Sequence, residues 1–241
     1  MKKRINQVIL LFTVMAIIFN CYAFTTDGNN TLTKEEKAAG WKLLFDGQST
    51  AGWHLYNSTA PFTLWKVKDG ELFCDPNDKS APGDLVTNGE YKNFDLKFEW
   101  KLPKGGNSGV FINVFEQKDI ATAWLSGPEY QLLDNANPDF AKPKARSGSL
   151  FGIEPQKNPV AIKSANNWNR SEIKQKDGKI KFYLNGVLTV SEDLTSKAWP
   201  EKIAATNFKS FPQFGKRING HITLQDWLTG VAFRNIKIKE L

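Results

Sequence analysis

Cysteine is scarce in this sequence, which contains Cys21 and Cys74 and no others. Cys21 falls in an N-terminal segment that opens with three basic residues and continues as an apolar run over residues 8–19. The run is too short to span a bilayer but has the length typical of the core of a secretion signal. We therefore predict that residues 1–23 are a signal peptide. The exported chain then retains only Cys74, so its core holds the fold without an internal disulfide.

Small residues set the expected cleavage position. Cys21 and Ala23 flank Tyr22 in a small-x-small arrangement, so Ala23 is predicted to be the last residue removed. The alternative is lipid attachment at Cys21, which the preceding Phe19 and Asn20 disfavour. The predicted location is the periplasm or the outer surface, with no stable membrane insertion after cleavage.

A large charge excess is also lacking. The whole chain has 32 basic and 25 acidic residues, a formal net charge of +7. Three of the basic residues belong to the signal segment, which leaves 29 against 25, a net charge of +4. A charge this small and this evenly spread argues against a nucleic-acid partner.

Several sequence motifs of known chemistry are missing. We find no internal repeat, low-complexity segment, zinc-ligand spacing or phosphate-binding loop. The segment GSLFG at residues 148–152 lacks the serine of the G-x-S-x-G nucleophile elbow, and Cys74 is expected to pack rather than react. These absences exclude the corresponding zinc, phosphate and serine-nucleophile chemistries, so any function depends on other polar residues.

Helix-like periodicity is confined to the segment TLTKEEKAAG. Thr33 can cap a short helix with Glu36 three residues later, and Gly40 follows as a stop. We therefore expect one short helix within an N-terminal segment, residues 24–39, ahead of a single β-sandwich domain at residues 40–241.

Most of the remaining chain reads as short strands. Alternating apolar segments are joined by turn dipeptides at Asp69-Gly70, Asp177-Gly178 and Asn185-Gly186. About a dozen such strands, with 12% aromatic residues, predict a jelly-roll β-sandwich of two antiparallel sheets. A barrel is the lesser alternative.

The segment GPEYQLLDN, residues 127–135, places two polar side chains in apolar company. Glu129 and Gln131 are two residues apart, so in a strand they point to the same face. That face is either the solvated side of an outer strand or the floor of a site. The residues alone leave both interpretations open.

Several segments resemble, in order, the 3-keto-disaccharide hydrolase family. They are residues 40–53, 83–111, 127–135, 166–173 and 184–186, followed by GHITLQD and FRNIKIKEL near the end. The resemblance covers essentially all of residues 40–241. It implies a concanavalin A-like lectin/glucanase sandwich that acts on glycosides whose C3 hydroxyl has been oxidised to a ketone.

Such a substrate has its own chemical demands. A 3-ketone acidifies the proton on C2, so one base can remove it while the C1 substituent leaves, which gives elimination or, once water adds, hydrolysis. The site needs one base and a polar cradle for the enolate oxygen. It does not need the pair of carboxylates at about 5–9 Å that ordinary glycosidases use.

With the resemblance in mind, Glu129 is the predicted base and Arg146 the predicted partner of the oxyanion, through its planar guanidinium. Asn107 and Ser108 are expected to shape a turn that leads into a strand. For each site candidate, the alternative is a packing, turn or surface role. The remaining predicted substrate contacts are Gln131, Asp134, Trp124, Lys209, His221, Asp226 and Trp227.

The chain departs from the family pattern at four positions. Related sequences commonly have histidine where this one has Asn137, Ala145 and Trp227, and tyrosine where it has Phe151. Without these imidazoles, the obvious ligands for a divalent cation are absent, so we predict no cofactor and no metal ligands, with a divalent cation held in another way as the open alternative. A changed substrate, or binding without turnover, are open alternatives.

Two function classes therefore follow from the sequence. One is an exported glycoside-processing enzyme; the other is a non-catalytic carbohydrate-binding module of the same fold, with Trp124 and Trp227 as stacking platforms. Catalysis requires a carboxylate in a pocket, whereas a binding module needs few buried ionisable groups. The position of Glu129, at the bottom of a cleft or on a flat face, discriminates between the two.

Overall fold

The structure is a computed structural model that describes residues 28–61, 64–78 and 82–241. The predicted signal segment, with Cys21 and Ala23, lies outside the described residues. Within the described ranges, no helix is long and apolar enough to cross a membrane.

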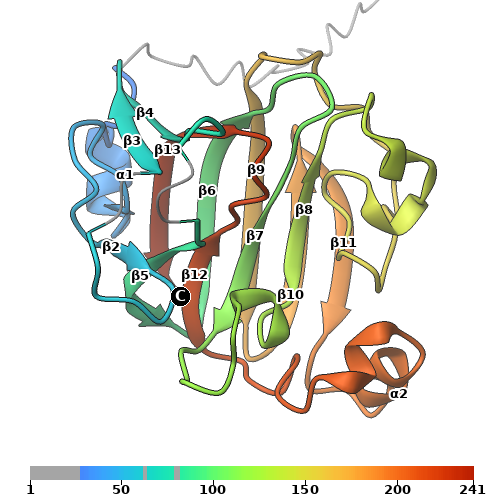
Figure 1. Cartoon of the computed structure of the whole chain (residues 1–241). Helices are drawn as coiled ribbons and strands as arrows, with labels where there is room; N and C mark the ends of the chain where they lie inside the picture. The colour runs from blue at the N-terminus through green and yellow to red at the C-terminus, as the bar shows by residue number, and fades with distance from the viewer. Residues whose placement is uncertain (1–27, 62–63, 79–81) are drawn as a thin grey trace, which may run out of the picture.

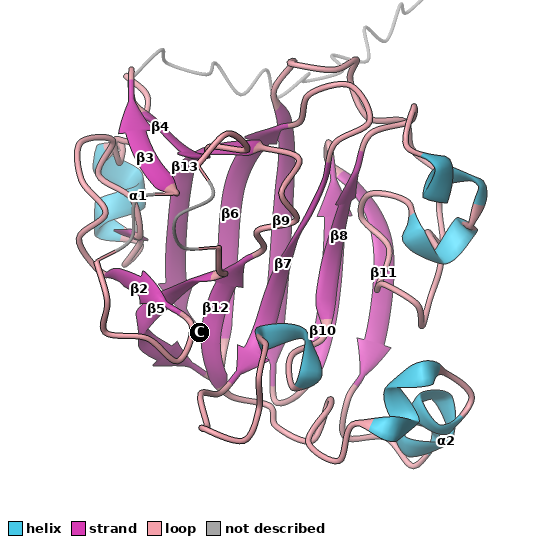
Figure 2. Cartoon of the chain, viewed as in Figure 1, coloured by secondary structure: helices cyan, strands magenta, loops and turns pink. Residues whose placement is uncertain are grey.

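In the described part of the chain, thirteen strands form two antiparallel sheets packed face to face (Figures 1 and 2). The smaller sheet has five strands in the order β2 (Trp53–Leu55), β5 (Leu85–Tyr91), β12 (Gly220–Leu224), β7 (Asn107–Val114) and β8 (Glu129–Leu133). This arrangement confirms the predicted β-sandwich of jelly-roll type and excludes the barrel.

The larger sheet has eight strands. Seven follow the order β11 (Val187–Asp193), β10 (Lys179–Leu184), β9 (Asn169–Lys176), β6 (Phe94–Lys101), β13 (Val231–Glu240), β4 (Glu71–Cys74) and β3 (Trp65–Lys68). The eighth, β1 (Lys42–Leu43), pairs with β13. The last strand of the chain therefore lies inside the sheet, between β6 and β4.

Tight two-residue turns connect three hairpins at the predicted dipeptides. Both residues of each turn have positive φ, between 49° and 86°, as a type I′ turn requires. Asparagine, aspartate and glycine tolerate this backbone region better than other residues do. The turns join β3 to β4, β9 to β10 and β10 to β11, at Asp69-Gly70, Asp177-Gly178 and Asn185-Gly186.

The short helix α1 (Lys34–Ala38) begins with a capping box. The Thr33 hydroxyl accepts the Glu36 amide at 3.1 Å, and the Glu36 carboxylate accepts the Thr33 amide at 3.2 Å. Two orphan donors at the start of the helix are thereby satisfied.

A second helix, α2 (Ala198–Ala204), shows that the expectation of a single helix was wrong. Only Trp199 of its seven residues is buried, and no side chain caps its start. Pro200 lies in the first turn, where the missing amide is tolerated. A helix this short leaves no apolar periodicity in the sequence, which is why the pattern missed it.

The core between the sheets consists of alternating inward side chains. On β6 these are Phe94, Leu96, Phe98 and Trp100, all buried. Polar groups in the core are paired: the Trp100 indole donates to the Ser171 hydroxyl at 2.8 Å, and Ser171 donates to the Tyr130 hydroxyl at 2.8 Å. Pairing removes the cost of burying these polar atoms.

Strand β8 is buried on both faces, unlike the half-exposed strands of the larger sheet. Short 3-10 helices and their loops cover the outer face of the smaller sheet, and Figure 1 shows the green turn of η1 (Ala123–Leu125) in front of it. The segment at residues 148–151 pairs with the free edge of β8, where the Phe151 amide donates to the Glu129 carbonyl at 3.1 Å. The other short helices are η2 (Pro138–Ala141), η3 (Pro143–Ala145) and η4 (Asn207–Ser210).

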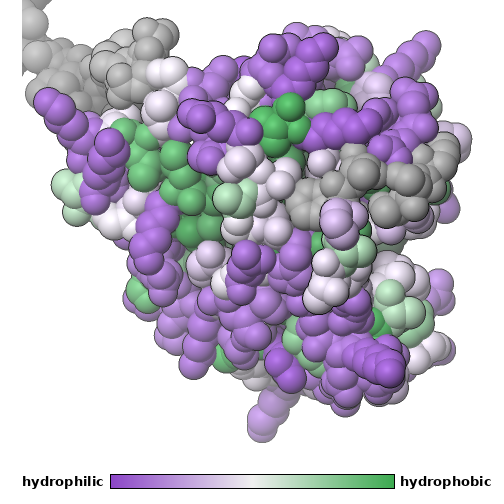
Figure 3. Space-filling view, turned by 60° about the vertical axis from the view of Figure 1, so that its left-hand side comes forward, coloured by the Kyte–Doolittle hydropathy of each residue, from purple (hydrophilic) through white to green (hydrophobic). Residues whose placement is uncertain are grey.

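The outer surface is polar over much of its area. The face turned forward in Figure 3 is mainly hydrophilic, and its hydrophobic residues lie in a few groups. On the outer face of the larger sheet, the Glu99 carboxylate accepts from Arg234 Nε at 2.7 Å and from Arg170 Nε at 3.0 Å. The charges of this face therefore neutralise one another locally.

Candidate active site

Strand pairing places four residues in one row on the outer face of the smaller sheet, two of them within β7 and β8 and two at the ends of β5 and β12. Gln131 pairs with Gly109 across β8 and β7. The Gln225 amide donates to the Gly109 carbonyl at 2.9 Å, and the register of β5 with β12 sets Asp84 beside Gln225. The row Asp84, Gln225, Gly109 and Gln131 thus crosses the sheet, and Glu129 belongs to the next row.

Gly109 lets the Glu129 side chain lie flat on the sheet. A Cβ atom added at Gly109 would lie 2.0 Å from Glu129 Oε1 and 2.7 Å from its Cδ, far inside contact distance. The carboxyl group therefore occupies the space that any other residue at position 109 would fill.

A cavity of about 180 Å³ lies above this floor. Its polar floor contains Glu129, Gln131, Asn107 and Gln225. Its walls are mainly aromatic, and the remaining lining residues are Gly127, Leu133, Asp139 and Ala145. Phe208 and Phe214 stack at 4.0 Å between ring centroids, which stiffens one wall. The aromatic wall residues are Phe111, Trp124, Phe151, Phe208, Phe214 and Trp227.

Glu129 is 6% exposed and faces into this cavity. Its Oε1 atom has no hydrogen-bond partner, and no cation pairs with it, among the residues that the structure describes. Burial, and secondarily the charge of Asp84, raise the pKa of the Glu129 carboxyl well above its ordinary value. A carboxyl that is buried, unpaired and directed into a cavity is typical of a catalytic or ligand-binding group.

Gln131 is held next to it by side-chain and backbone acceptors. Gln131 is 2% exposed, and its Nε2 donates to Asn107 Oδ1 at 2.7 Å and to the Leu132 carbonyl at 3.3 Å. Asn107, expected to shape a turn, is instead the first residue of β7 and part of the cavity floor. With both Glu129 and Gln131 buried, the face is not the solvated side of an outer strand.

A second hollow of about 510 Å³ adjoins the cavity. The two share Trp124, Gln225 and Trp227, and the second hollow adds Tyr56, Asp84 and Asp226 to its lining. Asp84 is only partly shielded from solvent, but the atoms packed around it raise its pKa to about 7 through desolvation. The amide and the charge of Asp226 act on it with opposite signs.

Sequence reasoning missed both Asp84 and Gln225. Asp84 precedes a strand in GDLVTNG, where an aspartate is typical of an ordinary turn. Its importance comes from the register of β5, β12 and β7, which joins segments more than 100 residues apart in the sequence.

Comparison with known proteins agrees with this architecture. The model of the 3-keto-alpha-glucoside-1,2-lyase-like domain matches residues 40–239. The chain belongs to this family. The family assignment confirms the resemblance read from the ordered segments.

Two relatives of known description are similar over most of the chain. A 3-keto-disaccharide hydrolase from Bacteroides thetaiotaomicron is 32% identical over 231 residues, covering 85% of this chain and 79% of that protein. A crystal structure from Parabacteroides distasonis, provisionally assigned as a glycosyl hydrolase, is 31% identical with a TM-score of 0.81 and covers 89% of this chain and 100% of that one. A second structure from the same organism, with the same provisional assignment, is 24% identical, with a TM-score of 0.63; it covers 83% of this chain and 99% of that one and shows the fold alone.

In this family member, Trp124 and Trp227 lie where the two hollows meet, and Asp226 lines the second. Trp227 is 54% exposed at the rim. Asp226 orders the loop below it, because its carboxylate accepts the Leu228 amide at 2.8 Å and the Cys74 thiol at 3.3 Å. Burial raises the pKa of the Cys74 thiol, which therefore remains protonated and packed.

Arg146 and Lys209 adjoin the cavity without lining it. Arg146 Nε donates to the Phe140 carbonyl at 3.0 Å, and the guanidinium lies 4.8 Å from the Phe140 ring centroid. Its neighbour Ala145 lines the cavity instead. Lys209 is exposed on η4, beside the wall residue Phe208.

Asp134 lies just beyond β8 and outside the cavity lining. Its Oδ1 accepts the Gly105 amide at 2.7 Å and the Ala136 amide at 3.0 Å. These bonds tie the segment before β7 to the segment after β8, so in this structure Asp134 supports the end of the floor.

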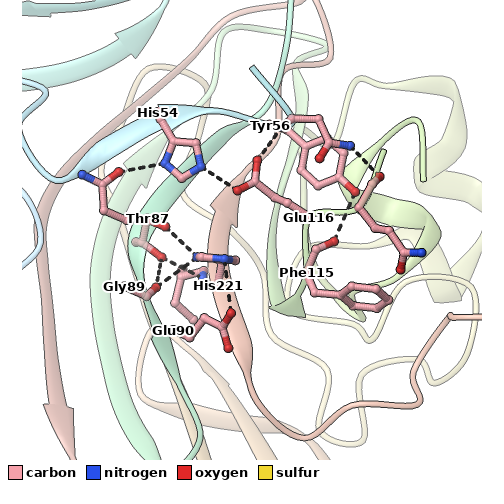
Figure 4. Close-up of polar contacts among 12 residues, drawn as sticks. His54, Tyr56, Thr87, Gly89, Glu90, Phe115, Glu116 and His221 are labelled. Atoms are coloured by element: carbon pink, nitrogen blue, oxygen red, sulfur yellow. Dashed lines mark hydrogen bonds and ion pairs between the residues drawn. The ribbon is translucent and has the colours of Figure 1, made fainter. Parts of the chain in front are cut away.

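His221 lies in a separate polar group, drawn in Figure 4, and lines neither hollow. Its Nδ1 lies 2.7 Å from the Thr87 carbonyl and its Nε2 is 3.6 Å from Glu90. The ring centroids of His54 and His221 are 6.1 Å apart. His54 Nε2 lies 2.7 Å from the Glu116 carboxylate. The structure therefore does not bring His221 to Glu129.

Three of the four positions that depart from the family pattern line the cavity. They are Ala145, Phe151 and Trp227, whereas Asn137 donates from Nδ2 to the Gly105 carbonyl at 2.9 Å. The walls of this member are therefore more apolar than the family pattern implies. Within the described residues, no three His, Cys, Asp or Glu side chains gather in an arrangement that could hold a metal ion.

Proposed function

We propose that this protein is a glycoside-processing enzyme that cleaves 3-keto-glycosides, including 3-keto-disaccharides, with Glu129 removing the proton from C2. The observation that carries the proposal is the buried, unpaired Glu129 carboxyl at the bottom of a cavity. Membership of the family, and similarity to a 3-keto-disaccharide hydrolase, support a hydrolase acting on glycosides.

The reaction begins at the acidic C2 proton. The Glu129 carboxylate takes it, and the electron pair of the C–H bond delocalises onto the C3 oxygen as an enolate. When the ketone re-forms, the bond between C1 and the leaving oxygen breaks, and the product is an unsaturated keto-sugar. Addition of water to that product gives net hydrolysis.

The raised pKa of Glu129 suits a general base. A carboxylate whose conjugate acid has a higher pKa is a stronger base, and efficiency is greatest when that pKa approaches the working pH. Burial of Glu129 raises its pKa in this direction. A surface carboxylate would be ionised at neutral pH but would bind a proton weakly.

The amide side chains on the floor provide the polar cradle. Gln131 and Gln225 lie on either side of Gly109, within the row over which the Glu129 carboxyl extends. Both N–H donors of Gln131 are engaged, with Asn107 Oδ1 and the Leu132 carbonyl, so Gln131 shapes the floor and Gln225 is the amide left to donate to the developing enolate oxygen. Such a donor lowers the barrier most in a cavity that excludes water. The predicted role of Arg146 stays a prediction, since its Nε is engaged with Phe140.

A carbohydrate-binding module is the second candidate. The exposed Trp227, together with Trp124 at the same rim, favours stacking on a sugar face. The burial of Glu129 favours the enzyme, because a binding module needs few buried ionisable groups, whereas catalysis requires a carboxyl in a pocket.

The test is incubation of the purified protein with 3-keto-glucosides and with their unoxidised parents. We expect release of the leaving group from the keto-sugars alone, and deuterium at C2 of the hydrolysed product when the reaction is run in D₂O. Tight binding without release or exchange would favour the binding module.

Export is part of the same proposal and rests on the sequence of residues 1–23. N-terminal sequencing of the secreted product is expected to start at Phe24. A diacylglyceryl group on Cys21 would instead support the lipoprotein.

A further inference from the structure

The two hollows on the outer face of the smaller sheet adjoin each other. Trp124, Gln225 and Trp227 line both. The second hollow, at about 510 Å³, is the larger of the two and is the neighbouring space for a ligand longer than one sugar ring.

Asp84 lines the second hollow and lies beside Gln225, which lines both hollows. Two strand spacings separate β5 from β7, so the backbones of Asp84 and Gly109 are roughly 10 Å apart. The Glu129 carboxyl extends over Gly109, in the row that leads through Gln225 to Asp84. A substrate that lies along this row can therefore reach both carboxyl groups.

The Asp84 side chain is anchored through one oxygen. The Asp226 amide donates to Asp84 Oδ1 at 2.9 Å, and the amide of Ala123 also stabilises the charged form. Desolvation outweighs both amides and raises the pKa of Asp84 to about 7. At neutral pH a sizeable fraction of Asp84 is thus protonated and able to donate.

We propose that the second hollow holds the leaving group of the glycoside, and that the Asp84 carboxyl donates a proton to the departing oxygen. This inference rests on the proposed function, in which Glu129 starts the reaction at C2. It assigns Asp84 as a second catalytic residue and the second hollow as a subsite for a sugar or other alcohol.

The proton balance closes over the whole cycle. Glu129 gains the C2 proton as the C–H bond breaks. As the bond from C1 to the leaving oxygen breaks, that oxygen takes the Asp84 proton and departs as an alcohol. Water then adds at C1: Asp84 takes a proton from the water, Glu129 returns its proton to C2, and both residues regain their starting states.

Two substrates with the same 3-keto-glucose and different leaving groups test the assignment. 4-Nitrophenolate departs without a proton, whereas methoxide needs one. We expect Asp84→Asn to retain activity on the nitrophenyl substrate within about 3-fold and to lose about 10²-fold on the methyl substrate. Glu129→Gln should lose activity on both.

The nitrophenyl activity of Asp84→Asn also reports that the variant is folded, and asparagine can still accept the Asp226 amide. Asp119→Asn removes an exposed carboxylate and serves as the matched control. If wild-type protein cleaves neither substrate, the proposed function fails. If wild type cleaves both and Asp84→Asn slows both equally, or neither, the Asp84 assignment is overturned while the proposed function stands.

Discussion

Glu99 and Glu129 lie on the outward faces of the two sheets, and both side chains are largely shielded from solvent. Glu99 on β6 accepts from the guanidinium groups of Arg234 and Arg170, at 2.7 Å and 3.0 Å. Glu129 on β8 has no cation beside it within the described residues, and its Oε1 is unpartnered.

The two glutamates differ in their effect on stability: Glu99 is stabilised by its ion pairs, whereas ionised Glu129 destabilises the folded state. A paired, hydrogen-bonded carboxylate regains much of the hydration that it loses. An unpaired buried one does not, so it destabilises the folded state whenever it ionises. The smaller sheet keeps such a group with a glycine beneath it, and the proposed function rests on this arrangement.

Exchanging each glutamate for its amide isolates this difference. We expect Glu129→Gln to lower turnover of 3-keto-glycosides about 10²–10⁴-fold, because the shape remains while the base is lost. Glu99→Gln, the matched control, should leave turnover unchanged. Steady-state kinetics of both variants measure the effect, and full activity in Glu129→Gln would refute the assignment.

Filling the space under Glu129 should reproduce part of that loss. The methyl group of Gly109→Ala would meet Glu129 Oε1 at 2.0 Å and push the flexible carboxyl off the floor. We expect turnover to fall about 10–100-fold, a loss of about 1.4–2.7 kcal/mol in transition-state stabilisation, with a smaller change in stability.

A double-mutant cycle shows whether the loss acts through Glu129. In a Glu129→Gln background, Gly109→Ala should add little further loss. Fully additive effects would mean that the alanine damages the site in another way.

Giving Glu129 a cation would make its environment resemble that of Glu99. Gln131→Lys places an ammonium two residues away on the same strand face, so the pKa of Glu129 falls by about 1–3 units. The acidic limb of the pH–rate profile should move down by that amount, with a lower maximum. The exposed Gln117→Lys adds the same charge elsewhere, and an identical profile for the two variants would contradict the prediction.

Stability should respond to pH through Asp84. Its folded-state pKa of about 7 lies above its ordinary 3.8, so the folded chain holds this proton more tightly than the unfolded chain does. The contribution of this proton to the free energy of unfolding is fully present below about pH 4 and is lost as the pH rises through 7. Asparagine does not titrate, so Asp84→Asn does not suffer this loss. In urea unfolding, the free energy of unfolding of Asp84→Asn should increase relative to that of wild type by about 1–3 kcal/mol between pH 5 and pH 8. A constant difference at both pH values would exclude the effect.

Much of the fold could be predicted because its signals are local. Each type I′ turn is specified by two adjacent residues, such as Asn185-Gly186, and each strand by its own alternation. The pairing of Glu129 with Gln131 on one face could be predicted for the same reason, since both lie on one strand. Helix α2 was not, because with one buried residue it has no pattern to read.

The rest of the site depends on register between distant strands. Asp84 and Gln225 lie side by side only because β5 and β12 pair in one alignment, and a shift of one residue in either strand would turn its polar residue to the other face. Arg146 and His221 show the converse: their chemistry fits the predicted roles, but backbone acceptors from Phe140 and Thr87 hold them outside the cavity.

Because β13 lies inside the larger sheet, that sheet cannot be completed until the residues of β13 have been synthesised. β13 covers residues 231–240 and separates β6 from β4, while β1 docks on it through Lys42 and Leu43. Until β13 is available, the larger sheet exists only as separate pieces with open edges, and residues 40–45 have no partner strand. Long-range pairing of this kind is slow. A ribosome-bound or partly translocated chain therefore remains open, so a protease or chaperone meets exposed strands until the last ten-residue strand arrives.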